Sequence, residues 1–178
     1  MRLILSSEHV RDATFTDSHG QVLYKTDTPF RLGSRTTTLS KIRPSRGFRD
    51  HFEVLGTIKW HKYSSTVFRF GGNELKTKDF IPSGGVLRRK RTFTGPDGRS
   101  YRWELGSKVV VLYLNSTFKT EVARLHRRSL GIIGRKKSPY LEVSPQVEHM
   151  LDLIILTFIY VEKLRMDKEK ASESVSVG

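Results

Sequence analysis

Cysteine is absent from the 178 residues, which excludes a disulfide framework, a thiolate nucleophile and a cysteine-ligated zinc site. Apolar runs long enough to cross a bilayer are absent too. The run Leu153–Val161 (LIILTFIYV) would span only about 14 Å as a helix, roughly half the hydrocarbon thickness. Met1–Ser6 holds three consecutive apolar residues, too few for the apolar core of a signal peptide. These absences predict an intracellular protein without a transmembrane span, either cytoplasmic, nuclear or peripherally attached to a membrane.

One helix is well marked near the carboxyl end of the sequence, over residues 145–167. Ser144 followed by Pro145 is typical of an N-cap with proline at the first helical position. At 100° per residue the apolar side chains of Leu153–Val161 point in every direction, whereas a helix on a protein surface has one apolar stripe. We therefore expect the rest of the protein to enclose this helix.

Asp152 lies where the chain enters the apolar run. It could pair with an arginine at the rim of the surrounding structure or face water. We expect pairing, because an unpaired carboxylate is costly to bury. Beyond the helix the sequence becomes small, polar and charged, which is typical of disorder. We predict one domain over residues 1–168 and a disordered tail over residues 169–178.

The sequence before this helix consists of strand and turn patterns. Runs rich in β-branched and aromatic residues are typical of strands, and clusters of Gly, Pro, Asn and Asp separate them. The clearest segments are His51–Trp60, Ser65–Phe70, Leu75–Ile81, Arg91–Thr94, Ser100–Leu105, Lys108–Leu114, Glu121–Arg128 and Tyr140–Val143. About ten or more strands and one apolar helix predict a closed antiparallel β-barrel around the helix, because a closed sheet covers it on all sides and leaves no exposed edge.

Two predicted hairpins share a pattern. Thr14-Phe15-Thr16 is followed by Gly20 and Tyr24, and Thr92-Phe93-Thr94 is followed by Gly98 and Tyr101. In each, an aspartate and the glycine supply turn chemistry that accepts positive φ. Two interpretations stay open: the hairpins at 14–24 and 92–101 are a true internal duplication, or the short pattern recurs by coincidence.

Six stretches resemble a family of uncharacterised domains from mushroom-forming fungi: MRLILSS at the start, the Thr14–Tyr24 hairpin, GTIKWH at Gly56–His61, FTGPDGRSYRW at Phe93–Trp103, VARLHRRSLGI at Val122–Ile132 and LDLIILTFIYVEKLR at Leu151–Arg165. The resemblance covers roughly residues 1–168. That family is similar in turn to the superfamily of tubby carboxy-terminal, phospholipid scramblase and LURP-one-like domains.

The superfamily resemblance implies a mainly β fold, a closed antiparallel β-barrel of about twelve strands threaded by a carboxy-terminal hydrophobic α-helix. The fungal family brings no known activity. Tubby domains associate with phosphoinositide membranes through basic surface residues, but the tubby signature is missing from this sequence, so the resemblance assigns no binding residue.

Charge is the strongest functional signal. The sequence has 32 lysines and arginines but only 18 aspartates and glutamates, which gives a net charge of +14. A positive surface attracts polyanions and anionic membranes. The candidate anion-binding residues form four clusters: Lys41, Arg43, Arg46 and Arg49; Arg88, Arg89, Lys90 and Arg91; Arg124, Arg127 and Arg128; and Arg135, Lys136 and Lys137. If the fold brings them to one face, they form a single anion-binding surface.

Three functions fit these clusters, all of them non-catalytic. The first is peripheral binding of anionic phospholipid or phosphoinositide. The second is a protein-interaction or structural module whose surface is incidentally basic. The third is non-specific nucleic-acid binding, with Phe93, Tyr101 and Trp103 as stacking platforms, although these aromatics fit the inward face of strands better. The oligomeric state stays open.

Enzyme motifs are missing. The six histidines are dispersed without metal-ligand spacing, so no metal site is predicted. Gly71-Gly72 and Gly84-Gly85 lack the lysine and helix that follow a phosphate-binding loop. Asp17 and Asp97 fit turns better than a catalytic carboxylate pair. We therefore expect no catalysis and no cofactor.

Overall fold

The computed structural model describes residues 1–30, 35–43, 51–61, 63–128 and 138–175. Within them, the strands are β1 Arg2–Leu5, β2 Thr14–Thr16, β3 Val22–Asp27, β4 Arg35–Arg43, β5 His51–Trp60, β6 Val67–Phe70, β7 Asn73–Lys76, β8 Ser83–Gly84, β9 Lys90–Thr94, β10 Ser100–Leu105, β11 Val110–Leu114, β12 Glu121–His126 and β13 Tyr140–Val143. The helices are α1 Thr77–Phe80, α2 Leu151–Val175 and the 3₁₀ turns η1 Val86–Arg88 and η2 Pro145–Met150.

All of these strands belong to one antiparallel sheet in the order β7-β6-β5-β4-β3-β2-β1-β13-β12-β11-β10-β9-β8. The chain forms two meanders, β1 to β7 and β8 to β13. Their junction is the pairing of β1 with β13, where Leu3 lies opposite Leu141. The prediction of a mainly β fold with a carboxy-terminal helix is confirmed.

The sheet is not closed by hydrogen bonds, so the predicted closed barrel is not confirmed. Its edge strands are β7 and β8, and the chain passes from one edge to the other through α1. Pro82 stands directly before β8 and has no N–H to donate to a neighbouring strand, and β8 itself is only two residues long. Side chains bridge the gap, because the ring of Phe80 lies 6.1 Å from Phe68 of β6 and 6.2 Å from Phe93 of β9.

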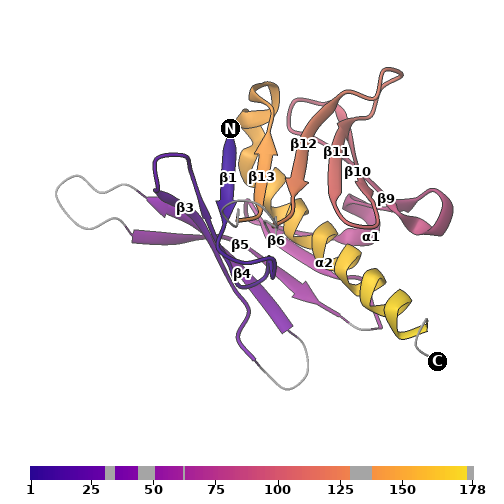
Figure 1. Ribbon diagram of the computed structural model, residues 1–178, viewed down its shortest axis with the longest axis horizontal. Helices are drawn as coiled ribbons and strands as arrows, with labels where there is room; N and C mark the ends of the chain where they lie inside the picture. Colours follow the sequence, from indigo (N-terminus) through magenta and orange to yellow (C-terminus); the bar gives the residue numbers. More distant parts are fainter. Residues whose placement is uncertain (31–34, 44–50, 62, 129–137, 176–178) are drawn as a thin grey trace, which may run out of the picture.

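Helix α2 runs between the two groups of strands, as Figure 1 shows. Its apolar residues are enclosed as predicted: Ile154, Ile155, Leu156, Phe158, Ile159 and Val161 are fully buried. Thr157, the one threonine in the run, donates to Leu153 O at 2.9 Å and accepts from Trp103 Nε1 at 3.1 Å. Both hydrogen bonds offset the cost of burying this polar group.

Both ends of the helix differ from the prediction. The first six residues, Pro145–Met150, form a 3₁₀ turn, and the α-helix continues to Val175, beyond the expected end at Asp167 and into the expected tail. Glu162 and Arg165, which follow the apolar run, are both buried. They stay inside because they pair with each other, Arg165 Nη2 to Glu162 Oε1 at 2.8 Å.

The two matching hairpins occupy equivalent places, as the second and third strands of their meanders. Phe15 lies opposite Tyr24, and Phe93 lies opposite Tyr101. In each turn the aspartate accepts backbone N–H groups: Asp17 from His19 and Gln21, Asp97 from Arg99. This shared position and chemistry support the duplication.

Candidate anion-binding surface

The first predicted cluster begins on β4, where Lys41 and Arg43 are both engaged by acidic residues. Lys41 Nζ lies 2.8 and 3.0 Å from the two carboxylate oxygens of Asp152, and Arg43 Nε lies 2.5 Å from Glu53 Oε2. Asp152 therefore has the expected basic partner, but that partner is a lysine, not an arginine. Arg46 and Arg49, the rest of this cluster, lie outside the described residues.

A tyrosine completes the Asp152 site. Tyr24 Oη donates to Asp152 Oδ1 at 2.5 Å. Burial of the tyrosine, and then this hydrogen bond, raise the pKa of Tyr24 well above its usual value. Lys41 thus neutralises a structural carboxylate at the start of α2 instead of offering a free charge.

The third cluster, on β12 and just beyond it, is also largely neutralised. Arg124 forms a two-bond pair with Glu121 at 2.8 and 2.6 Å. The Glu121 carboxylate raises the pKa of Arg124. Arg127 lies 3.5 Å from Glu8 and 3.3 Å from Glu169 of α2. Arg128 is exposed; its backbone N–H donates to Glu8 Oε1 at 3.4 Å, and its guanidinium forms no ion pair in the described part of the chain.

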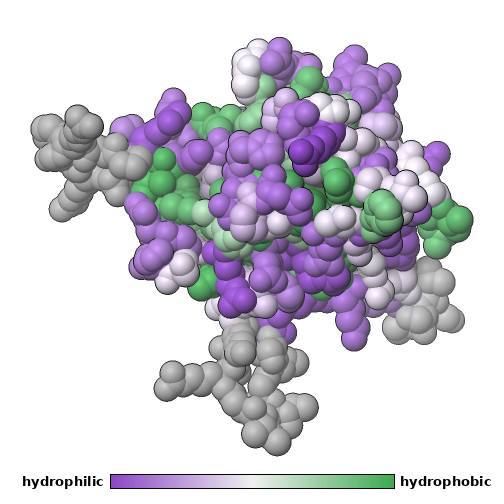
Figure 2. Space-filling model, turned by 90° about the horizontal axis from the view of Figure 1, so that it is seen from above, coloured by the Kyte–Doolittle hydropathy of each residue, from purple (hydrophilic) through white to green (hydrophobic). Residues whose placement is uncertain are grey.

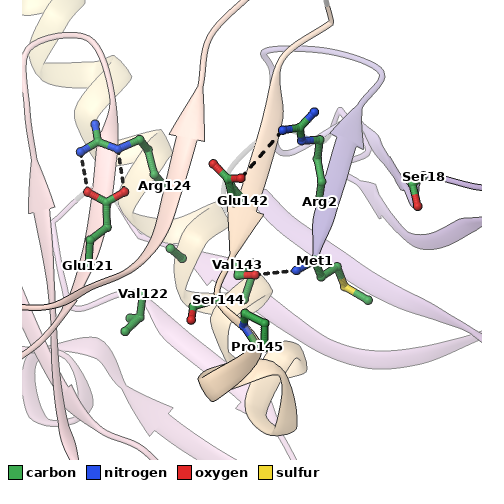
Figure 3. A pocket seen from close by; sticks show the side chains of 11 residues that line it. Met1, Arg2, Ser18, Glu121, Val122, Arg124, Glu142, Val143, Ser144 and Pro145 are labelled. Carbon is green, nitrogen blue, oxygen red and sulfur yellow. Dashed lines mark hydrogen bonds and ion pairs between the residues drawn. The ribbon is translucent and has the colours of Figure 1, made fainter.

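A pocket of about 590 Å³ lies beside this cluster. Figure 3 shows the residues from β1, β12 and β13 that line it. Its charges face each other: Arg124 meets Glu121, and Arg2 lies 3.8 Å from Glu142. The net charge of its lining is therefore small, and we assign it no ligand. Within the described residues no group of three His, Asp or Glu side chains could hold a metal ion.

The second cluster forms a positive surface with a residue that the sequence did not associate with it. Lys168 of α2 donates to Leu87 O at 2.7 Å, which places its ammonium among the neighbouring arginines. We call this group the cationic surface; its members are Arg88, Arg89, Lys90, Arg91 and Lys168. None of the five forms an ion pair with an acidic residue in the described ranges of the chain.

The positive charges of the cationic surface act on Lys168. Burial lowers the pKa of this lysine, and the positive charges of Arg89, Arg91 and Arg88 lower it further. An anion placed against these groups would reverse the unfavourable interaction. The cationic surface is therefore predisposed to bind a negatively charged ligand.

Local backbone geometry limits strand alternation in the Arg88–Arg91 block to its last two residues. Leu87 and Arg88 are left-handed, with φ of 59° and 52°, so β9 begins only at Lys90. Arg89 turns back to donate to Leu105 O at 3.1 Å. Within β9, Lys90 lies opposite Glu104 and Arg91 lies opposite Trp103 of β10, so these two side chains point to opposite faces of the sheet.

The predicted clusters do not all converge. Lys41 meets Asp152 near the start of α2, whereas the cationic surface meets Lys168 sixteen residues later, about 24 Å along a helix. Arg127 bonds Glu169, so it lies at the same end as Lys168. Arg135, Lys136 and Lys137 lie outside the described residues.

The aromatic residues considered as stacking platforms face the core. Phe93, Tyr101 and Trp103 are 2%, 0% and 0% exposed, as the strand interpretation predicted. Trp103 lies 6.1 Å from Phe158 of α2. These rings are therefore not accessible to the bases of a nucleic acid.

Comparison with known proteins gives one match. Residues 8–167 match a protein family described as "Family of unknown function (DUF6593)". No curated protein and no solved structure matches the chain. Among the described residues, no helix is both long enough and apolar enough to cross a membrane.

Proposed function

Because the chain belongs to DUF6593, a family of unknown function, we propose from its surface chemistry that it is a non-catalytic module that binds anionic phospholipid membranes peripherally. The contact is the cationic surface formed by η1, β9 and Lys168. The observation that carries the proposal is geometric: Lys168 Nζ lies 2.7 Å from Leu87 O, which brings its ammonium to the Arg88–Arg91 run. No acidic residue of the described chain forms an ion pair with these five basic residues. The lowered pKa of Lys168 agrees with this crowding of positive charge.

The number of free charges suits a membrane. A basic residue beside an anionic lipid surface contributes about 1 kcal/mol, so five together give several kcal/mol. Such binding is weakened by salt, because exposed charges are screened. Hydrophobic residues on the face shown in Figure 2 occur in small groups between hydrophilic ones.

A protein-interaction module and a nucleic-acid binder remain the competing functions, and one experiment separates them. The protein is sedimented with vesicles of phosphatidylcholine alone or with added phosphatidylserine or phosphoinositide, at low and at high salt. We expect sedimentation only with the anionic vesicles and release by salt. Absence of binding at low salt would contradict the proposal, and binding to single-stranded DNA but not to vesicles would favour the nucleic acid.

We also propose that this family shares the fold of the tubby, scramblase and LURP-one-like superfamily. The wrapped helix and the antiparallel meanders support this kinship, and the fungal origin implied by the resemblance stays a prediction. A solved structure tests the kinship: it should superpose on tubby-like barrels strand by strand around α2, whereas a different strand order would contradict the relationship.

A further inference from the structure

Two apolar side chains project at the margin of the cationic surface. Val86 is 86% exposed and Leu87 is 70% exposed, and both precede the basic run that begins at Arg88. We call this pair the apolar tip. An exposed aliphatic pair beside unpaired cations is a combination that fits the boundary between lipid headgroups and acyl chains.

The backbone holds the tip in place. Leu87 O accepts from Lys168 Nζ at 2.7 Å, and Arg88 N donates to Gly85 O at 3.2 Å. On the C-terminal side, Leu105 N donates to Arg89 O at 2.8 Å. The tip is therefore fastened to both α2 and β10.

The conformation of the tip is strained as well as anchored. Leu87 and Arg88 have φ of 59° and 52°, a left-handed conformation that disfavours residues other than glycine by about 1 kcal/mol or more each. Such strain persists where surrounding contacts enforce it. Here those contacts point Val86 and Leu87 into solvent instead of the core.

We propose that Val86 and Leu87 insert into the interfacial region of an anionic bilayer while the cationic surface contacts the phosphate groups of the lipids. This inference rests on the proposed function and adds the orientation and depth of binding. A lipid surface fits better than a protein, because a two-residue apolar tip is far smaller than a specific protein interface of about 1,200 Å² or more. The surrounding positive charge complements anionic headgroups.

Tryptophan fluorescence tests the insertion directly. The two native tryptophans, Trp60 and Trp103, are buried at 8% and 0% exposure, so vesicles should change their emission little. The difference between Leu87→Trp and the unaltered protein therefore reports on the introduced tryptophan. With anionic vesicles we expect its emission to shift to the blue, and we expect lipids brominated near the top of the acyl chains to quench it.

Phe118→Trp is the matched control. Phe118 is 90% exposed in the turn between β11 and β12. That turn lies by Ser100, where Asn115 N bonds Ser100 O at 2.9 Å, at the opposite end of β10 from Leu105. Its emission should not change with vesicles. A second variant, Val86→Ser with Leu87→Ser, should bind anionic vesicles about tenfold more weakly, because it removes most of the apolar area of the tip.

The outcomes separate the two proposals. If the Leu87→Trp protein sediments with anionic vesicles but is not quenched, insertion is wrong and peripheral binding stands. If brominated lipids quench the fluorescence of Phe118→Trp but not that of Leu87→Trp, insertion of the apolar tip is also wrong. The turn at Phe118, at the other end of β10, would then face the bilayer. If the unaltered protein does not sediment with anionic vesicles, the proposed function fails and the insertion inference fails with it.

Discussion

Asp152 connects the sheet to the central helix through two side chains from neighbouring strands. Tyr24 of β3 donates to it at 2.5 Å, and Lys41 of β4 at 2.8 Å. The sequence indicated that this carboxylate needs a partner. It could not identify Lys41, because the two residues are 111 positions apart and only the wrapping of the sheet brings them together.

Replacing Tyr24 with phenylalanine should destabilise the protein by about 1–2 kcal/mol, because a hydrogen bond to a charged group is lost in a half-buried site. Urea unfolding measures this change. Tyr140→Phe is the control, since the Tyr140 hydroxyl makes no hydrogen bond to a residue in the described ranges. Equal stability of the two variants would contradict the assigned role of Tyr24.

Tyr101 predicts an alkaline loss of stability. Burial, and then the hydrogen bond to Asp97, raise the pKa of Tyr101 to about 12. A tyrosine in the unfolded chain titrates near pH 10, so between pH 10 and 12 the folded protein retains a proton that the unfolded chain loses. The stability contributed by this group is therefore complete below pH 10 and falls as the pH rises through about 12.

Comparing unfolding of the unaltered protein and Tyr101→Phe from pH 9 to 12 isolates this contribution. We expect the variant to be less stable at pH 9 and the difference to shrink as the pH rises. If the difference in unfolding free energy between the two proteins stays constant across this window, the pKa of Tyr101 is not raised in the folded protein.

At the scale of the elements, α1 and Phe80 form the seam between the two sheet edges. The sequence predicted a strand over residues 75–81, because they lie between two turn signals, Gly71–Glu74 and Pro82–Gly85. The structure ends β7 at Lys76 and starts α1 at Thr77. Thr77 N donates to Thr66 O and Lys78 N to Ser65 Oγ, contacts with distant residues that the local pattern does not show.

Phe80→Ala should weaken this seam by about 2–3 kcal/mol, because the half-buried ring contacts both Phe68 and Phe93 and its loss leaves a cavity. The variant should also speed hydrogen exchange of the amides of α1 and β9 more than those of β1 and β13. Phe118→Ala, at a ring that is 90% exposed, is the control and should change neither. Uniform acceleration of exchange would contradict a local seam.

The regular elements were the most predictable. The strands β5, β10 and β13 match their predicted bounds, because their alternating apolar residues face a core on one side. The all-round apolar pattern of α2 likewise identified the central element. The closure of the sheet was not predictable, since it depends on whether β7 and β8 pair, and proline and a two-residue strand prevent that pairing.

At the scale of the whole molecule, the basic residues behind the net charge of +14 are not equally available to a ligand. Lys41, Arg43, Arg124 and Arg127 pair with acidic residues, whereas the cationic surface does not. The sequence located the Arg88–Arg91 block but could not tell paired from unpaired charges. Lys168 was missed for the same reason, since its association with Leu87 spans 81 positions.

The central claim is that anionic membranes bind at the cationic surface and not through the net charge in general. Two variants with the same change in net charge test it most directly: Arg88→Glu with Lys90→Glu, and Lys59→Glu with Lys76→Glu on the exposed side of β5 and β7. All four residues are exposed, so folding should survive, which circular dichroism and thermal unfolding check.

The measurement is the affinity of each variant for vesicles containing phosphatidylserine at low salt. We predict that Arg88→Glu with Lys90→Glu binds at least about thirtyfold more weakly than the unaltered protein, from about 1 kcal/mol for each basic residue removed. Lys59→Glu with Lys76→Glu should lose only a few-fold. Equal losses in the two variants would show that the overall charge governs binding, and would contradict a dedicated membrane-binding surface.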